Sequence, residues 1–152
     1  MIIYIGADHR GFALKGKLIE VLKAGGWEVV DVGAKELDPG DDFPDYASLV
    51  AAKVSETPDH VHGIVICGSG FGVDIVANKF KGVRSALSTS PDQAYQGRHD
   101  SDANVLALPA SFVDEETAVK IMKVFLSTPF GTDERCARRL GKIKAIESGS
   151  GQ

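Results

Sequence analysis

Short apolar runs rich in β-branched residues alternate along this chain with longer stretches whose apolar residues have helical spacing. Strands that alternate with helices form a parallel sheet with helices on both faces, because a parallel crossover needs a connection of helical length. The alternation therefore predicts one doubly wound α/β domain. The runs predicted as strands are MIIYIG (1–6), EVVDVG (28–33), HGIVICG (62–68), VRSALS (83–88) and NVLALP (104–109).

The predicted helices have recognisable ends. Gly25-Gly26 ends a helix predicted over 12–24, and Ser90-Pro91 followed by Gln93 is typical of a capped helix start. Asp114 caps a helix whose core face carries Ala118, Ile121, Met122, Phe125 and Leu126. Three further helices are predicted: one after Pro44, one beginning in the glycine-rich loop after 68, and one starting near Thr132 with Leu140, Ile143 and Ile146 facing the core.

Length, charge and cysteine content narrow the class of protein. The chain has 152 residues, of which 43% are hydrophobic, and this suits one domain, placed at 1–147, with a flexible tail at 148–152. A net charge of −4 argues against binding to nucleic acid or a membrane surface, and no apolar run approaches the length of a membrane span. The start of the chain has no basic region, so no signal peptide is expected, and two cysteines predict a cytoplasmic protein without a disulfide framework.

Polar and glycine-rich residues follow the predicted strands. GADHRG follows the first strand, CGSGFG the third, STSPD the fourth and PAS the fifth. In open parallel sheets, ligands bind beyond the carboxyl ends of the strands. We therefore expect the functional site at that edge.

The glycine-rich loop holds Cys67, Gly68, Gly70 and Gly72. Its spacing is one residue short of a dinucleotide fingerprint and it follows a late strand, while the Gly-Lys-Ser/Thr of a phosphate loop is absent. The glycines do fit a cluster of backbone N–H groups that binds an anion, and such a cluster would favour a thiolate at Cys67. The alternative is that Cys67 is an inert buried strand residue.

The other candidates also have two interpretations. Asp8 and His9 are either site residues or a turn aspartate beside a surface histidine. His99, expected near the carboxyl end of a helix, is either functional or a solvated histidine favoured by the helix dipole. Arg135 and Arg139 are four residues apart and share a helix face, which either grips a phosphate or is simply solvated.

One pattern has metal-ligand spacing. Asp59, His60 and His62 form DHVH just before the third strand. That position is at the edge opposite the glycine-rich loop, so no metal site is predicted there.

These motifs together resemble the ribose-5-phosphate isomerase B family, which includes the galactose-6-phosphate isomerase subunits. The motifs that carry the resemblance are GADHRGFALK, DFPDYA, GIVICGSGFGVDIVANKFKGVRSAL, NVLALP, FLSTPF and ERCARRLGKI. The resemblance implies a Rossmann-like sheet and a cofactor-free, metal-free isomerase that interconverts an aldose phosphate and a ketose phosphate. It also implies a homodimer whose active sites are built from both subunits, and it leaves dimer versus tetramer open.

The resemblance also implies roles for individual residues. Cys67 matches the catalytic base, because Phe71 stands where some relatives have a glutamate base. Ser69 keeps a hydroxyl next to it, and His99 matches the residue that opens the sugar ring. The remaining expected site residues are Asp8, counted with the catalytic group, and the substrate-binding His9, Tyr46, Gly68, Gly70, Phe71, Gly72, Asp100, Arg135 and Arg139.

Four departures from the family pattern fall on the expected pocket. Asp100 stands where asparagine is usual, Ser111 where arginine is common and Cys136 where histidine is frequent, and segment 99–104 is one residue longer. They bear on the substrate more than on the reaction type. We expect D-ribose 5-phosphate and D-ribulose 5-phosphate as substrates, with a tetrose or hexose phosphate, or a non-catalytic sugar-phosphate-binding subunit, as the alternatives.

Overall fold

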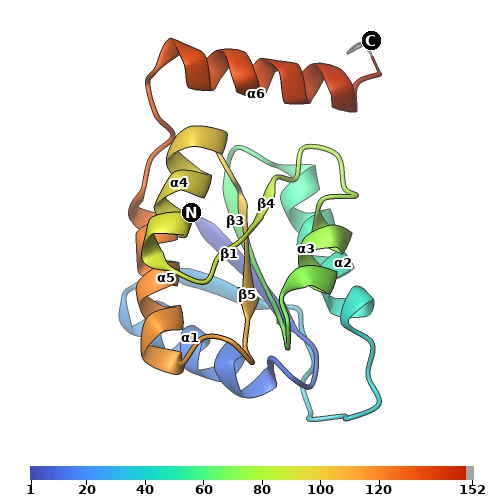
Figure 1. Ribbon diagram of the computed structural model, residues 1–152. Coiled ribbons are helices and arrows are strands. Elements are labelled where there is room, and N and C mark those ends of the chain that lie inside the picture. The colour runs from blue at the N-terminus through green and yellow to red at the C-terminus, as the bar shows by residue number, and fades with distance from the viewer. Residues whose placement is uncertain (150–152) are drawn as a thin grey trace.

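The computed structural model describes residues 1–149, which form five parallel strands and six helices (Figure 1). The strands are β1 (Ile2–Ala7), β2 (Glu28–Asp31), β3 (Val61–Cys67), β4 (Ser85–Leu87) and β5 (Val105–Pro109). The helices are α1 (Phe12–Ala24), α2 (Phe43–Glu56), α3 (Phe71–Ala77), α4 (Pro91–Ser101), α5 (Glu115–Ser127) and α6 (Glu134–Glu147). The strand order is β2-β1-β3-β5-β4, and every pairing is parallel, so the predicted doubly wound α/β fold is confirmed.

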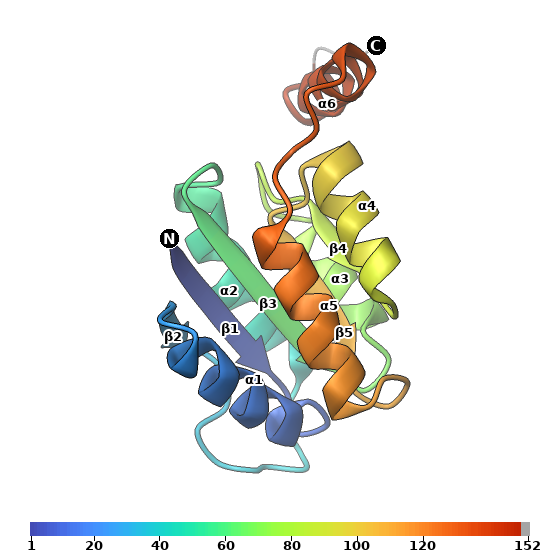
Figure 2. The same ribbon diagram turned by 90° about the vertical axis from the view of Figure 1, so that its left-hand side faces the viewer.

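Helices cover both faces of the sheet (Figures 1 and 2). Helices α1, α4 and α5 lie on one face, and α2 and α3 lie on the other. The central strand β3 is buried at every position and alternates between the two cores. Ile64 and Ile66 pack in the core under α1 and α5, whereas Val65 and Cys67 pack in the core under α2 and α3. The alternation of β3 therefore directs the Cys67 side chain to the α2–α3 face.

The predicted caps of two helices are present. The Ser90 side chain accepts a hydrogen bond from the Gln93 backbone N–H at 3.3 Å, and the Asp114 carboxylate accepts one from the Thr117 N–H at 2.7 Å. Helix α5 buries Ala118, Ile121, Met122, Phe125 and Leu126, as predicted. Among residues 1–149, no helix is long and apolar enough to cross a membrane.

The prediction that Leu140, Ile143 and Ile146 of α6 all face the core is wrong. Leu140 is buried, but Ile143 is 46% exposed and Ile146 is 70% exposed. The reason is that α6 does not lie over the sheet: it stands beyond one end of the domain, next to α4 (Figures 1 and 2). Of the predicted tail, Ser148 follows this helix, Gly149 lies in a turn, and 150–152 are outside the described residues.

A buried histidine makes the fold sensitive to acid. His62 lies within β3, and its ring meets the edge of Phe125 with 5.6 Å between ring centroids. Burial, together with the positive charge of Arg98, lowers the pKa of His62 to about 4. Because an unfolded histidine titrates near 6.5, the unfolded chain binds a proton between about pH 6.5 and 4 that the folded chain does not.

We predict that stability falls as the pH is lowered through this interval. The His62 contribution is fully present above about pH 6.5 and is lost progressively towards pH 4, by roughly 3 kcal/mol in total. Urea unfolding of the wild type and of His62→Gln at several pH values measures the difference in slope. His60→Gln is the matched control, because His60 is exposed, and it should keep the wild-type slope. Parallel curves for the wild type and His62→Gln would show that His62 does not titrate this way.

Candidate active site

A pocket of about 380 Å³ opens at the carboxyl ends of β1, β3 and β5. It lies at the sheet edge where the sequence predicts the functional site. Residues from the loops after these three strands surround it, together with the first residues of α2 and α3. Its lining is Asp8, Arg10, Phe43, Cys67, Gly68, Ser69, Gly72, Ser111 and Phe112.

Cys67 is the last residue of β3 and is 4% exposed. Its sulfur accepts a hydrogen bond from the Gly70 backbone N–H, with a donor–acceptor distance of 3.1 Å. Gly70 has a φ of 77°, and a side chain there would collide with Leu87, so glycine is required for this turn. One backbone N–H of the glycine-rich loop thus points at the sulfur.

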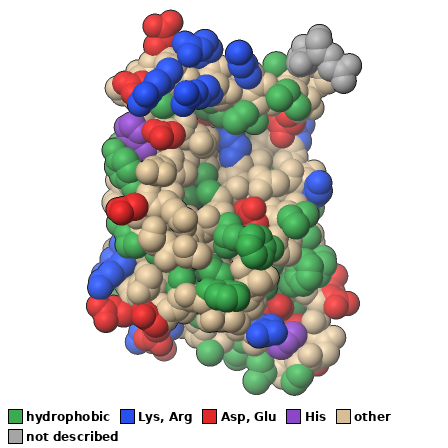
Figure 3. Space-filling model, viewed as in Figure 1, with side chains coloured by type: hydrophobic (Ala, Val, Ile, Leu, Met, Phe, Trp, Pro, Cys, Tyr) green, Lys and Arg blue, Asp and Glu red, His purple; other side chains and the backbone are tan. Residues whose placement is uncertain are grey.

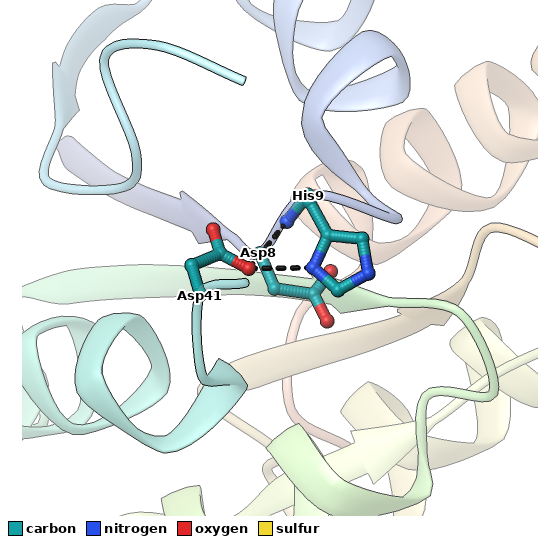
Figure 4. A group of neighbouring side chains, drawn as sticks. All are labelled: Asp8, His9 and Asp41. Carbon is teal, nitrogen blue, oxygen red and sulfur yellow. Dashed lines mark hydrogen bonds and ion pairs between the residues drawn. The ribbon is translucent and has the colours of Figure 1, made fainter. Parts of the chain in front are cut away.

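Asp8, His9 and Asp41 lie close together at this pocket, and hydrogen bonds join His9 to Asp41 (Figure 4). One Asp8 oxygen accepts the backbone N–H groups of Arg10 and Gly11, each at 3.0 Å. One Asp41 oxygen accepts the His9 backbone N–H at 3.0 Å and lies 2.6 Å from His9 Nδ1. Asp41 therefore fixes the orientation of the His9 ring and determines which ring nitrogen remains available.

The contact with His9 favours the charged form of the Asp41 carboxylate. Burial alone raises the pKa of Asp41, but the hydrogen bonds and charge of His9 outweigh it and hold that pKa below its usual value. Desolvation and the neighbouring Asp41 carboxylate raise the pKa of Tyr46 above its ordinary value. Asp41 thus connects two expected site residues, His9 and Tyr46.

The metal-ligand pattern in DHVH does not form a ligand group. His62 is buried in β3 against Phe125, whereas His60 is exposed in the preceding turn. Among residues 1–149, the one group of three or more potential ligands within 4.8 Å of one another is the cluster of Asp8, His9 and Asp41. Within this group, His9 Nδ1 and Asp41 are already hydrogen-bonded to each other.

His99 and Asp100 lie away from this pocket, near the carboxyl end of α4. The His99 ring stacks on Tyr95 with 5.1 Å between centroids, and its Nδ1 lies 2.8 Å from the Asp100 carboxylate. The His99 carbonyl accepts the Gly131 backbone N–H at 2.8 Å. His99 is thus attached to the segment that leads into α6.

Arg135 and Arg139 are exposed on α6, at the end of the domain opposite the pocket (Figures 1 and 2). Lys and Arg side chains gather over this helix in Figure 3. Arg135 pairs with Asp133 at 3.3 Å, which offsets the unfavourable placement of an arginine in a first helical turn. A single chain therefore carries the expected site residues in two separate groups: a pocket group around Cys67 and a helical group comprising His99, Asp100, Arg135 and Arg139.

The structure places some of the other expected residues in the pocket lining and adds members that the sequence did not suggest. Ser69, Gly68 and Gly72 line the pocket, and Phe71 is 64% exposed at the start of α3. The additions are Arg10, Asp41, Phe43 and Phe112. Arg10 follows Asp8-His9 directly, which is the one sequence signal that could have found it.

Comparison with known proteins identifies the family. The family model described as Ribose/Galactose Isomerase matches residues 3–143. The chain belongs to the ribose/galactose isomerase family. Within this family it is 44% identical over 145 residues to a probable ribose-5-phosphate isomerase B of Mycoplasma pneumoniae, covering 95% of this chain and 94% of that protein. The ribose-5-phosphate isomerase B of Mycobacterium tuberculosis is 36% identical over 147 residues, covering 97% and 90%.

A solved structure of the same family is also similar. The crystal structure of ribose-5-phosphate isomerase B from Mycoplasma genitalium with bound ribulose-5-phosphate superposes with a TM-score of 0.94 at 43% identity. The match covers 97% of this chain and 96% of that one. The Rossmann-like fold and the family resemblance drawn from the motifs are both confirmed.

Proposed function

We propose that this member of the ribose/galactose isomerase family interconverts D-ribose 5-phosphate and D-ribulose 5-phosphate, with Cys67 as the base. The observation that carries the proposal is the Cys67 sulfur, which lies in a pocket at the carboxyl ends of the strands and accepts a backbone N–H. The relatives named ribose-5-phosphate isomerase B support the choice of substrate.

The reaction transfers a proton between two neighbouring carbons. The Cys67 thiolate removes the proton from the carbon next to the carbonyl; the C–H bond breaks, an S–H bond forms and the electron pair enters an enediolate. Return of the proton from sulfur to the neighbouring carbon regenerates the thiolate. A second proton passes from the oxygen of the original hydroxyl to the oxygen of the original carbonyl, and this completes the exchange of aldehyde and ketone. One carbon is oxidised as the other is reduced, so the substrate itself balances the electrons.

The other pocket residues have roles that follow from their placement. The Ser69 hydroxyl and the amide groups at the start of α3 can donate to the enediolate oxygens, where negative charge develops. Asp8 lines the same pocket and is 4% exposed, so it is placed to contact a sugar hydroxyl. His99 is assigned to ring opening, as the family resemblance implies.

The proposal includes a homodimer, because the pocket group and the helical group cannot meet within one chain. A second copy that brings its α6 to the pocket would place His99, Arg135 and Arg139 against the substrate bound near Cys67. The exposed apolar side chains on α6 support this. Ile143 and Ile146 line an uncovered hollow of about 510 Å³ between α4 and α6, which a partner would bury.

Two further assignments complete the proposal. Helix α6 packs against α4 of the same chain, so we assign residues 1–147 to one isomerase domain. Cys67 and Cys136 are free thiols, which suits the reducing cytoplasm.

An isomerase assay over a panel of aldose phosphates tests the function. We expect the highest kcat/KM with ribose 5-phosphate and lower values with tetrose and hexose phosphates. A clear preference for another aldose phosphate would correct the substrate and leave the reaction in place. The absence of turnover on every sugar phosphate would contradict the enzyme assignment and favour a non-catalytic binding subunit.

A further inference from the structure

Arg10 spans one wall of the pocket. It follows β1, and its guanidinium lies against the backbone of Gly68, where a side chain would begin 2.5 Å from Arg10 Nε. Its Nη2 donates a hydrogen bond to the Ser111 hydroxyl at 3.3 Å, which connects the loop after β1 to the loop after β5. Only a glycine at position 68 allows this approach.

Arg10 is the one positively charged side chain among the residues that line this pocket. The remaining lining residues are acidic, polar or apolar, and Arg10 forms no ion pair with a carboxylate within residues 1–149. Asp8, in the same pocket, accepts the Arg10 backbone N–H rather than pairing with its guanidinium. A guanidinium has five N–H donors, and the bond to Ser111 uses one of them.

We propose that Arg10 binds the phosphate group of the substrate within this chain's own pocket, with Ser111 as its positioning residue. The inference rests on the proposed function, and it adds a phosphate contact that comes from the same chain as Cys67. Two guanidinium N–H groups can hold two oxygens of one phosphate, an arrangement that a single ammonium group cannot provide.

The depth of the groups in the pocket favours the phosphate over the enediolate. Cys67 is buried, so the reacting carbons must lie at the pocket floor, whereas Arg10 and Ser111 are both exposed. A phosphate dianion is strongly hydrated and is held most readily where water can still reach it. Its contact with Arg10 is the same in substrate and transition state, so it should affect KM and leave kcat unchanged.

Kinetics of Arg10→Gln with ribose 5-phosphate test the inference. We expect KM to rise about tenfold and kcat to stay within about twofold, because a charged hydrogen bond that contributes only to binding is lost. The KM of Arg10→Lys should lie between those of the wild type and Arg10→Gln, because lysine keeps the positive charge but cannot hold two phosphate oxygens with one planar group. Lys23→Gln is the matched control, because it removes the same charge from an exposed position on α1 away from the pocket, and it should leave both constants unchanged. An unchanged KM in Arg10→Gln, or a fall in kcat alone, would overturn the assignment.

A second measurement separates this inference from the isomerase function. Alkylation of Cys67 by iodoacetamide can be followed by peptide mapping, with and without inorganic phosphate as the probe. We expect phosphate to slow the alkylation of wild-type Cys67 and to have little effect in Arg10→Gln. Equal protection in both proteins would overturn the role of Arg10. A wild type that is protected by phosphate but turns over no sugar phosphate would contradict the proposed function alone.

Discussion

Cys67→Ala lowers the kcat for ribose 5-phosphate by about a thousandfold or more, because removal of a positioned base costs on that scale and no other base is proposed. The sulfur is the one thiol among the residues that line the pocket and it accepts the Gly70 N–H, so its loss removes the proposed proton acceptor itself. Steady-state kinetics on purified protein provide the measurement. A thermal unfolding curve checks that the small cavity left by the sulfur costs only about 1 kcal/mol.

Cys67→Ser distinguishes a base from a group that only shapes the loop. Serine preserves the size of the side chain and can still accept the Gly70 N–H, but its hydroxyl ionises far less readily than a thiol. The serine variant should therefore be nearly as inactive as the alanine variant. Full activity in Cys67→Ala would rule out Cys67 as the base while leaving family membership intact.

Mixing two proteins that are each nearly inactive at a substrate concentration near the wild-type KM restores activity at that concentration if the active site is shared between subunits. One parent is Cys67→Ala and the other is the double variant Arg135→Ala/Arg139→Ala, which we expect to raise KM at least about a hundredfold through the loss of two phosphate contacts. In a mixed dimer, one site receives both defects and the other receives neither. Unfolding and refolding an equal mixture should recover about a quarter of wild-type activity, since half of the dimers are mixed and each has one intact site.

The control for this mixing uses two variants of the pocket group. Cys67→Ala mixed with Asp8→Ala leaves one defect in every site of a mixed dimer, so no activity should return. If the arginine and cysteine parents also fail to complement each other while mixed dimers are present, each site is built within one chain and the proposed assembly is wrong.

Much of the fold follows from local patterns, because strand periodicity and capping signals are properties of adjacent residues. Ser90 and Asp114 cap the helices that the sequence predicts, and the carboxyl-edge rule locates the pocket around Cys67. The packing of α6 could not be predicted in the same way. The spacing of Leu140, Ile143 and Ile146 shows that they share a helix face, but it does not show whether that face meets the same chain or a partner.

The parts of the site that sequence reasoning missed depend on contacts between distant loops. Asp41 lies 32 positions after His9 in a segment without periodicity, and only the folded chain brings the carboxylate to the ring. Ser111 lies 101 positions after Arg10, and their contact depends on the path of two loops around Gly68. The separation of His99 from Cys67 has the same origin, because motifs do not state how far apart their residues lie in the folded chain.

The pairing of β3 with its neighbours has a consequence for the chemistry. Cys67 is opposite Pro109 of β5, and Ile66 is opposite Ala7 of β1, so the thiol faces α2 and α3 only in this register. A shift by one residue would turn Ile66 towards the pocket and bury the thiol under α1 and α5. The branched side chains of Ile64 and Ile66 act against that shift, since it would remove them from their own core. The hydrophobic alternation of a single strand thus determines which side chain reaches the pocket, and a mispaired sheet would be a folded protein without the proposed base.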